Sequence, residues 1–396
     1  MLPLVTVLAA LVLLAIVLQD AFEVMLLPRR VYRRRRLARI FFRISWTAWV
    51  WLANRLPEGE RRNRLLGVFG PLSLVVLFAL WAALLIIGFG LLDWAMQAPR
   101  HPYGLNSEIY LSGVTFFTTG YGDVAPNNTA TRVLSVVESG TGLGFIAVVI
   151  GYLPVLYQLF ARREAHVIQL DARAGSPPTG STMLVLHAEM NGLPQLNELL
   201  REWEIWGAEL LESHLSYPML VYYRSQHDNQ SWLGAMTAVM DACALILVGV
   251  EGVPPLQARM TFTMIRQVVV EMSRALTVKP SAYEGEDRLP HERYERMEKA
   301  FATAGLMWKG GPEAEEVLHA LRATYEPLLD GLAKRLLLTL PPWTPAEDAI
   351  DHWQGGHRGL IASRLIAQLA RPDSRDAKPG PAAGGLARRL RNRLEQ

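Results

Sequence analysis

Three long apolar runs limit what this chain can fold into. The first covers residues 4–27 and is almost unbroken Leu, Val, Ile and Ala up to Val17. The second covers 72–92, entered through Gly70-Pro71, and the third covers 132–160. A helix of about 20 apolar residues crosses the hydrocarbon core of a bilayer, and proline suits the first turn of a helix. The sequence therefore predicts an all-α membrane protein with three transmembrane helices.

The first run is interpreted as an uncleaved membrane anchor. A signal peptide begins with basic residues and has an apolar region of only about 7–15 residues. Nothing basic precedes residue 4, and the apolar run is longer than that. Asp20 and Glu23 near its inner end are expected to pair with Arg29 or Arg33 rather than to bind an ion.

Arginines between the first two runs predict the orientation in the membrane. They are opposed there only by Glu58 and Glu60. The arginines are Arg29, Arg30, Arg33, Arg34, Arg35, Arg36, Arg39, Arg43, Arg55, Arg61, Arg62 and Arg64. The positive-inside rule makes this loop cytoplasmic. We therefore expect a multi-pass protein of the cell (plasma) membrane, with its N-terminus outside, residues 93–131 on the outer side and the C-terminus cytoplasmic.

The charge distribution favours a lipid surface over a nucleic acid as the partner of the basic half. Residues 1–160 carry 14 Arg, no Lys and 8 acidic residues, whereas 161–396 carry 26 basic and 29 acidic residues. Basic charge beside apolar runs is typical of membrane surfaces. We expect anionic lipids to bind Arg29, Arg30, Arg33, Arg34, Arg35 and Arg36.

Residues 37–56 allow two interpretations. Phe41, Phe42, Trp46 and two further tryptophans could indicate a fourth span. A span there would either leave the arginines at 29–36 on the outer side or reverse the predicted orientation of every later segment in the membrane. The favoured interpretation is a helix in the inner interface, with its aromatic side chains in lipid and its arginines at headgroups.

The segment between the second and third runs predicts a helix that enters the membrane without crossing it. A helix from Ser107 to Phe117, capped by Asn106 or Ser107, would be about 16 Å long, half a bilayer. The partial negative charge at its C-terminus favours a cation. Irregular backbone at such depth survives only inside protein or along an aqueous path.

The residues after this helix suit cation coordination. Gly120 and Gly122 can adopt positive φ, so successive carbonyls can turn to one side. A file of carbonyl oxygens replaces the hydration shell of K⁺. The hydroxyl of Thr118 could add one more layer of oxygens.

The run Thr118-Thr119-Gly120-Tyr121-Gly122, followed by Asp123 and Pro126, resembles the selectivity filter of potassium channels, usually TVGYG. The order of span, re-entrant helix, filter and span also resembles the pore domain of that superfamily, of bacterial type. The resemblance implies that the carbonyls of Thr118, Thr119, Gly120 and Tyr121 and the Thr118 hydroxyl coordinate K⁺. Gly122 and Asp123 would form the outer mouth. One filter per chain implies a homotetramer, because four chains close the carbonyl ring.

The resemblance also implies a position for gating. Gly142 lies where inner helices commonly carry a hinge, although Gly140 and Gly144 are alternatives, and Pro154 is a second candidate for bending.

Two departures from the family lie near the filter. Phe117 stands where Thr is usual, and Val114 replaces a carboxylate found in some bacterial channels. Asp123 is expected to bond instead to the hydroxyl of Tyr110. Glu138 inside the third run is expected to bond to Ser112 or Thr115; the alternative is a charge that tunes conduction or its pH response.

The C-terminal half is predicted to be helical. One expected helix begins at Pro194, and five others cover 232–250, 256–276, 291–308, 312–340 and 358–369. Residues 217–223 could form a short extended piece. The apolar run 232–250 is interpreted as a buried core helix because Asp241 lies at its centre. Cys243 is expected to be a buried small residue.

Several site classes are not indicated by this half. It contains no G-x-G-x-x-G, P-loop or H-E-x-x-H motif, and its histidines lack zinc-ligand spacing. We expect no cofactor other than K⁺ as the permeant ion, and no enzymatic activity.

The expected organisation has six parts. They are an N-terminal transmembrane helix at 1–27, a basic interfacial segment at 28–66, the pore domain at 67–160, a linker at 161–180, a helical cytoplasmic domain at 181–372 and a flexible basic tail at 373–396. The predicted function is passive, K⁺-selective conduction gated at the inner helix. The alternative is a non-conducting membrane sensor on a channel-like scaffold. An uptake transporter would need four pore repeats in one chain.

Overall fold

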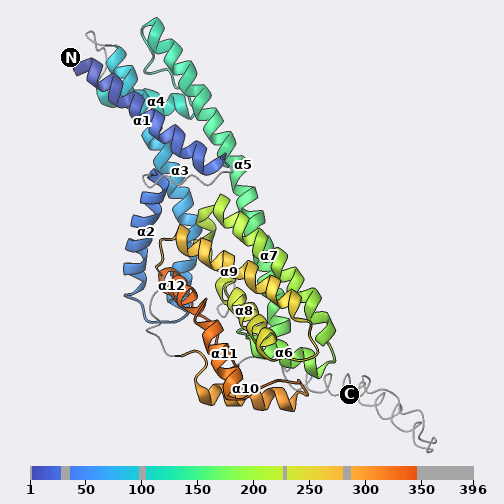
Figure 1. The fold of residues 1–396 in the computed structure, drawn as a ribbon. Helices are drawn as coiled ribbons and strands as arrows, with labels where there is room; N and C mark the ends of the chain where they lie inside the picture. The colour runs from blue at the N-terminus through green and yellow to red at the C-terminus, as the bar shows by residue number, and fades with distance from the viewer. Residues whose placement is uncertain (1, 28–35, 98–103, 226–229, 280–286, 346–396) are drawn as a thin grey trace, which may run out of the picture. The chain divides into compact units, whose positions relative to one another are not determined.

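The computed structural model describes residues 2–27, 36–97, 104–225, 230–279 and 287–345 (Figure 1). These belong to one compact unit that spans 1–349. Their regular structure is helical, and an isolated β-bridge pairs Val250 with Trp308. The predicted all-α class is confirmed.

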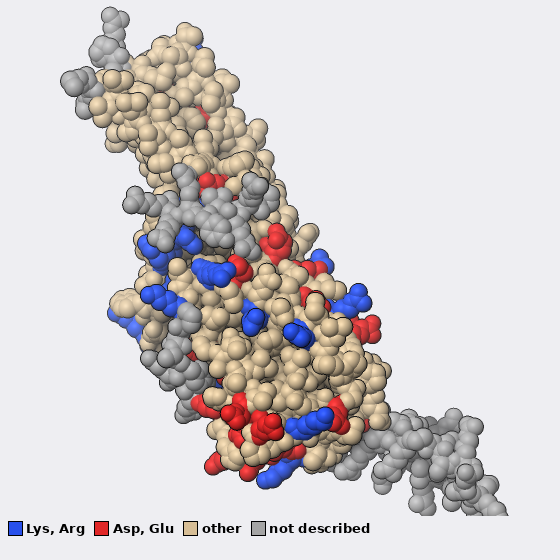
Figure 2. All heavy atoms as spheres, viewed as in Figure 1, with Lys and Arg blue, Asp and Glu red and all other residues tan. Residues whose placement is uncertain are grey.

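Three helices are long and apolar enough to cross a membrane, as predicted. They are α1 (Leu2–Met25), α3 (Glu60–Met96) and α5 (Thr129–Ala174). Figure 2 shows few charged side chains on the visible face around α1, α4 and the start of α5, whereas charges gather over the rest. Such a surface suits a hydrocarbon environment at one end and water at the other.

Two of these helices extend beyond the apolar runs. α3 begins at Glu60, so Pro71 lies inside the helix and not in its first turn. α5 continues through 161–174, where we expected a linker to begin. Val167, Leu170 and Ala174 are fully buried in the core of the C-terminal helices, which explains why the chain stays helical there.

The half-length helix is present as α4 (Leu105–Phe116). Its N-cap is Gly104, without a side-chain cap, so the expected cap at Asn106 or Ser107 is wrong. The chain then runs without regular structure to Asn128, whose side chain accepts from the Thr131 amide at 2.9 Å and begins α5. The order of long helix, short helix, turn and long helix matches the prediction.

Helix α2 (Leu37–Ala53) is not among the membrane-capable helices. Asp20 of α1 holds its beginning by accepting from the Ala38 amide at 2.9 Å and from Trp81 Nε1 at 3.1 Å. The expectation that its aromatic side chains lie in lipid is wrong for Trp46. That indole is 2% exposed and donates to the Arg335 carbonyl at 3.0 Å.

The acidic pair near the inner end of α1 is held by local contacts. Glu23 pairs with Arg36 at 2.7 Å, and Asp20 caps α2. The expected partners Arg29 and Arg33 lie outside the described residues.

The C-terminal part consists of seven α-helices within its described residues. They are α6 (Gly180–Glu189), α7 (Leu196–Ser216), α8 (Trp232–Val248), α9 (Pro255–Ala275), α10 (His291–Thr303), α11 (Pro312–Arg322) and α12 (Glu326–Leu336). Helix α6 was not predicted, and 312–340 divides into α11 and α12. The piece at 217–223 forms a 3₁₀ helix (Pro218–Tyr222), not an extended strand. The expected helix at 358–369 and the tail lie outside the described residues.

Helix α8 is a buried core helix, as predicted. Asp241 at its centre is fully buried and forms an ion pair with Arg288 at 2.5 Å. Arg288 also contacts Glu326 at 2.8 Å, and the Tyr325 hydroxyl donates to Asp241 at 2.8 Å. Tyr325 lies in the break between α11 and α12, and Pro327 in the first turn of α12 lacks the amide hydrogen that a continuous helix would need. Cys243 is buried, as expected.

Candidate functional site

The segment between α4 and α5 has an alternating backbone conformation. Thr118, Gly120 and Gly122 have φ of 55°, 61° and 80°, whereas Thr119 and Tyr121 do not have positive φ. A positive φ is costly for a threonine and marks a functional candidate. The segment is tied to the end of α4, since the Val114 carbonyl accepts from the amides of Thr119 at 2.7 Å and Gly120 at 3.3 Å.

The same segment is exposed in the single chain. Tyr121 is 71% exposed and Phe117 is 51% exposed. Apolar side chains along α5 are exposed as well, among them Val136 at 74% and Ile150 at 65%. Exposed apolar surface of this extent marks contact with lipid or another protein.

The outer end of the segment is supported by α4. The Tyr110 hydroxyl donates to Asp123 Oδ1 at 3.3 Å, so the hydrogen bond expected from the sequence is present. It joins the residue after Gly122 to the middle of the half-length helix.

Glu138 of α5 contacts Ser112 of α4, which was one of its two expected partners. The Ser112 hydroxyl also lies 2.8 Å from the Ile86 carbonyl of α3. Glu138 is fully buried, and its Oε2 has no hydrogen-bond partner. These contacts connect α3, α4 and α5 behind the exposed segment.

Two further buried carboxylates of this region were missed in the sequence. Asp93 of α3 is fully buried and Glu108 of α4 is 1% exposed. A negative charge on Asp93 would repel negative charges on Glu108 and Glu138. Each residue stands alone in the sequence, and the only signal was an acidic residue beside an apolar run.

The three glycines proposed for the hinge differ in their surroundings. A Cβ on Gly142 would lie 2.0 Å from the Phe116 carbonyl oxygen, whereas one on Gly140 or Gly144 would have nothing within 4 Å. Gly142 is therefore the one at which α5 approaches the end of α4. α5 is a continuous helix through both Gly142 and Pro154, so their role in bending stays a prediction.

The inner part of α5 is bound to the C-terminal helices by Arg163, which is 4% exposed. Its guanidinium donates to the carbonyls of Leu220 at 2.9 Å and Tyr223 at 2.7 Å, and pairs with Glu164 at 2.9 Å. It also lies 3.3 Å from His214 Nε2. Since arginine only donates, this nitrogen accepts, and burial and the nearby guanidinium lower the pKa of His214 to about 3.

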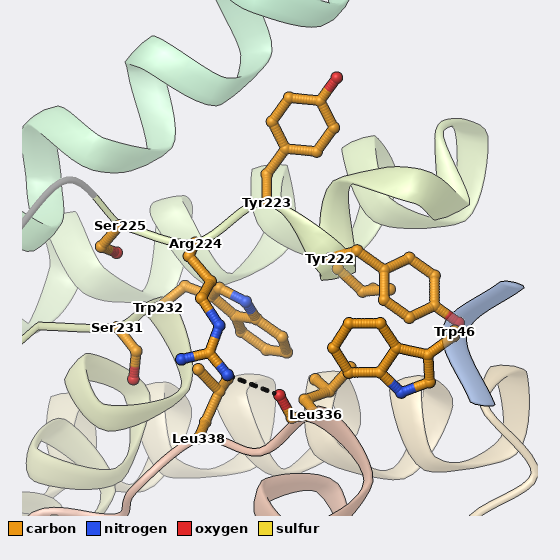
Figure 3. A pocket seen from close by; sticks show the side chains of 10 residues that line it. Trp46, Tyr222, Tyr223, Arg224, Ser225, Ser231, Trp232, Leu336 and Leu338 are labelled. Atoms are coloured by element: carbon orange, nitrogen blue, oxygen red, sulfur yellow. Dashed lines mark hydrogen bonds between the residues drawn. The ribbon is translucent and has the colours of Figure 1, made fainter. Parts of the chain in front are cut away.

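A second junction joins α2 and α12 to the segment after the 3₁₀ helix. Figure 3 shows Arg224 between Tyr223 and Leu336, with Trp46 and Tyr222 beside it. Arg224 donates to the Leu336 carbonyl at 3.0 Å, and burial lowers its pKa to about 10. The cavity there is about 10 Å³, room for about one water molecule. The junction is structural rather than a ligand site.

Among the described residues, no group of three or more His, Cys, Asp or Glu side chains is arranged to hold a metal ion. The backbone segment 118–122 is thus the candidate cation site that the geometry offers. Its predicted ligands are carbonyls and one hydroxyl.

Comparison with known proteins gives a family for the segment that contains this site. Residues 73–158 match a family model described as ion channel. The match extends from α3 through α4 and the exposed segment into α5, and it confirms the resemblance of this part of the chain to ion channels. Together with the three membrane-capable helices, it supports a multi-pass membrane protein.

A curated relative covers more of the chain. The uncharacterized membrane protein YdjJ of Bacillus subtilis is 24% identical over 212 residues, which are 52% of this chain and 60% of that protein. The chain thus spans well under two thirds of this relative. No solved structure matches the chain significantly.

Proposed function

We propose that this protein is a K⁺-selective channel that conducts passively across the plasma membrane as a homotetramer. The observation that carries the proposal is the alternating backbone at Thr118, Gly120 and Gly122, which follows a half-length helix within a segment that matches ion channels. Alternate left- and right-handed residues turn successive carbonyls to one side, as K⁺ coordination requires. Thr118, Thr119, Gly120 and Tyr121 would supply these oxygens.

The exposed surface of the single chain supports assembly. The segment 118–122 and the apolar side chains of α5 are uncovered. Carbonyl oxygens from one chain provide one side of a coordination shell, and four copies around an axis close it. The same assembly would cover the apolar face of α5.

Gating and lipid contact are part of the proposal. The gate would lie along α5, with bending near Gly142 and Pro154, biased by the C-terminal helices that hold Arg163. Anionic headgroups would bind the arginines at 29–35. Arg36 is engaged in its ion pair with Glu23.

The test is a reversal potential. Purified protein in a planar bilayer with unequal K⁺ and Na⁺ on the two sides should reverse near the K⁺ equilibrium potential. Gly120→Ala should abolish this selectivity, because alanine is strained at a φ of 61° although nothing lies within 4 Å of its Cβ. Gly113→Ala on α4 is the matched control, since its Cβ would be 3.8 Å from Ile86 and make ordinary contact.

Two results would contradict the proposal. A reversal potential that Na⁺ and K⁺ set equally would contradict selectivity. Silence under varied voltage, pH and Ca²⁺, from protein shown to be tetrameric, would favour the non-conducting sensor.

A further inference from the structure

The contacts of Ser112 favour one protonation state of a neighbouring carboxyl group. The Ser112 hydroxyl lies within hydrogen-bond distance of the Ile86 carbonyl and of Glu138 Oε1. A hydroxyl has one hydrogen, and a backbone carbonyl only accepts. Ser112 can therefore donate to only one of these two oxygens when Glu138 is ionised. Both contacts can be hydrogen bonds when Glu138 is protonated, because the carboxyl group then donates to Ser112.

The surroundings of Glu138 favour the same state. Its Oε2 has no hydrogen-bond partner, and a buried carboxylate with one weak contact is costly. Asp93, from α3, is fully buried and neither of its carboxylate oxygens has a hydrogen-bond partner. A negative charge on Asp93 would repel negative charges on Glu138 and on Glu108 of α4. If both were ionised in a membrane-embedded region, Asp93 and Glu138 would repel each other.

Within the described residues, the charged groups that act on Asp93 and Glu138 are carboxylates. The groups that act on Glu138 are Ser112 and Asp93, and the group that acts on Asp93 is Glu108. Among the described residues, Lys, Arg and His are absent from both sets. Arg100 and His101 lie outside the described residues.

We propose that Asp93 and Glu138 form a proton-binding site behind α4, in which Glu138 holds the proton and donates a hydrogen bond to Ser112. Raising the pH removes this proton to solvent. Ser112 can then donate either to the Glu138 carboxylate or to the Ile86 carbonyl, so one of the two contacts is lost, and the new charge of Glu138 repels Asp93. The contact that joins α3, α4 and α5 weakens, and conduction falls. The last step rests on the proposed channel function, whereas the proton site does not.

The proton can be detected without any transport measurement. The infrared spectrum of the purified full-length protein in lipid at neutral pH should contain the C=O stretch of a protonated carboxyl group. The difference spectrum between wild type and Glu138→Gln should show loss of this band. Glu58→Gln is the matched control, because the Glu58 side chain is 92% exposed whereas that of Glu138 is buried. A Glu138→Gln difference spectrum without a lost protonated band would overturn the proposal.

A pH series of K⁺ flux tests the consequence. Flux through the wild type should fall as the outer pH rises from neutral to alkaline. Glu138→Gln should conduct without this fall, because its amide stays neutral and can donate to Ser112 as the acid does. An equal fall in Glu138→Gln and wild type would overturn the coupling to conduction. If neither conducts, the channel function fails, and the infrared result still decides the proton site.

Discussion

Replacing Gly142 by alanine should damage the junction between α5 and α4. The new Cβ would lie 2.0 Å from the Phe116 carbonyl oxygen, 2.8 Å from its carbon and 3.0 Å from its Cα. All three atoms are backbone, so no side-chain rotation relieves the overlap, and the helices must separate by about 1 Å. Overpacking of this kind costs about 1–3 kcal/mol. Because Phe116 lies two residues before Thr118, the displacement reaches the candidate filter directly.

The assay compares stability and transport for three alanine variants. We expect Gly142→Ala to melt at a lower temperature than wild type and to lose K⁺ flux in liposomes. Gly140→Ala and Gly144→Ala should melt no lower than wild type, because nothing in the chain lies within 4 Å of their added Cβ atoms and alanine favours a helix over glycine. A pure hinge at residue 142 would reduce flux and leave melting unchanged. Wild-type melting of Gly142→Ala would therefore refute the close-packing argument.

Three further predictions concern individual side-chain contacts. Arg163→Met should destabilise the protein by about 3 kcal/mol in a melting assay, because two buried carbonyls lose their donor. The control Arg162→Met removes an exposed ion pair and should cost under about 1 kcal/mol. Equal costs for the two variants would contradict the role of the buried guanidinium. The hydrogen bond to Glu315 of α11 raises the pKa of His291. Wild type should therefore be more stable than His291→Gln below about pH 6.5, and the difference in stability should vanish as the pH rises through the raised pKa. A difference in stability that grows with pH would contradict this reasoning. Tyr110→Phe removes the hydrogen bond to Asp123 and should alter selectivity or inactivation in bilayer recordings; unchanged behaviour in both would show that this bond does not support the filter.

The membrane-capable helices and the half-length helix were predictable because their signals are local. Apolar runs such as 72–92 and the sequence of residues 118–123 are visible without knowledge of any partner. The Tyr110 and Ser112 contacts were also predictable, since a short helix between two spans leaves few polar groups within reach of Asp123 and Glu138.

The remaining features depend on packing between distant segments. Trp46 has the composition of an interfacial aromatic, but the Arg335 carbonyl, far along the chain, makes it a core residue. Asp93 and Glu108 meet Glu138 only when α3, α4 and α5 come together. Proline usually marks the start of a helix, whereas Pro71 lies within α3, which already begins at Glu60.

The unbroken course of α5 makes it a lever. Its 46 residues span about 69 Å at the usual rise per residue. The close contact at Gly142 acts as a fulcrum near the outer end, and about 48 Å of helix extends from there to Ala174. Rotation by about 5° around this fulcrum moves the inner end by about 4 Å, while the residues beside the filter move by less than about 2 Å. In the proposed tetramer, a movement of the C-terminal helices that pulls on Arg163 would thus widen or narrow the inner end and leave the candidate filter nearly fixed.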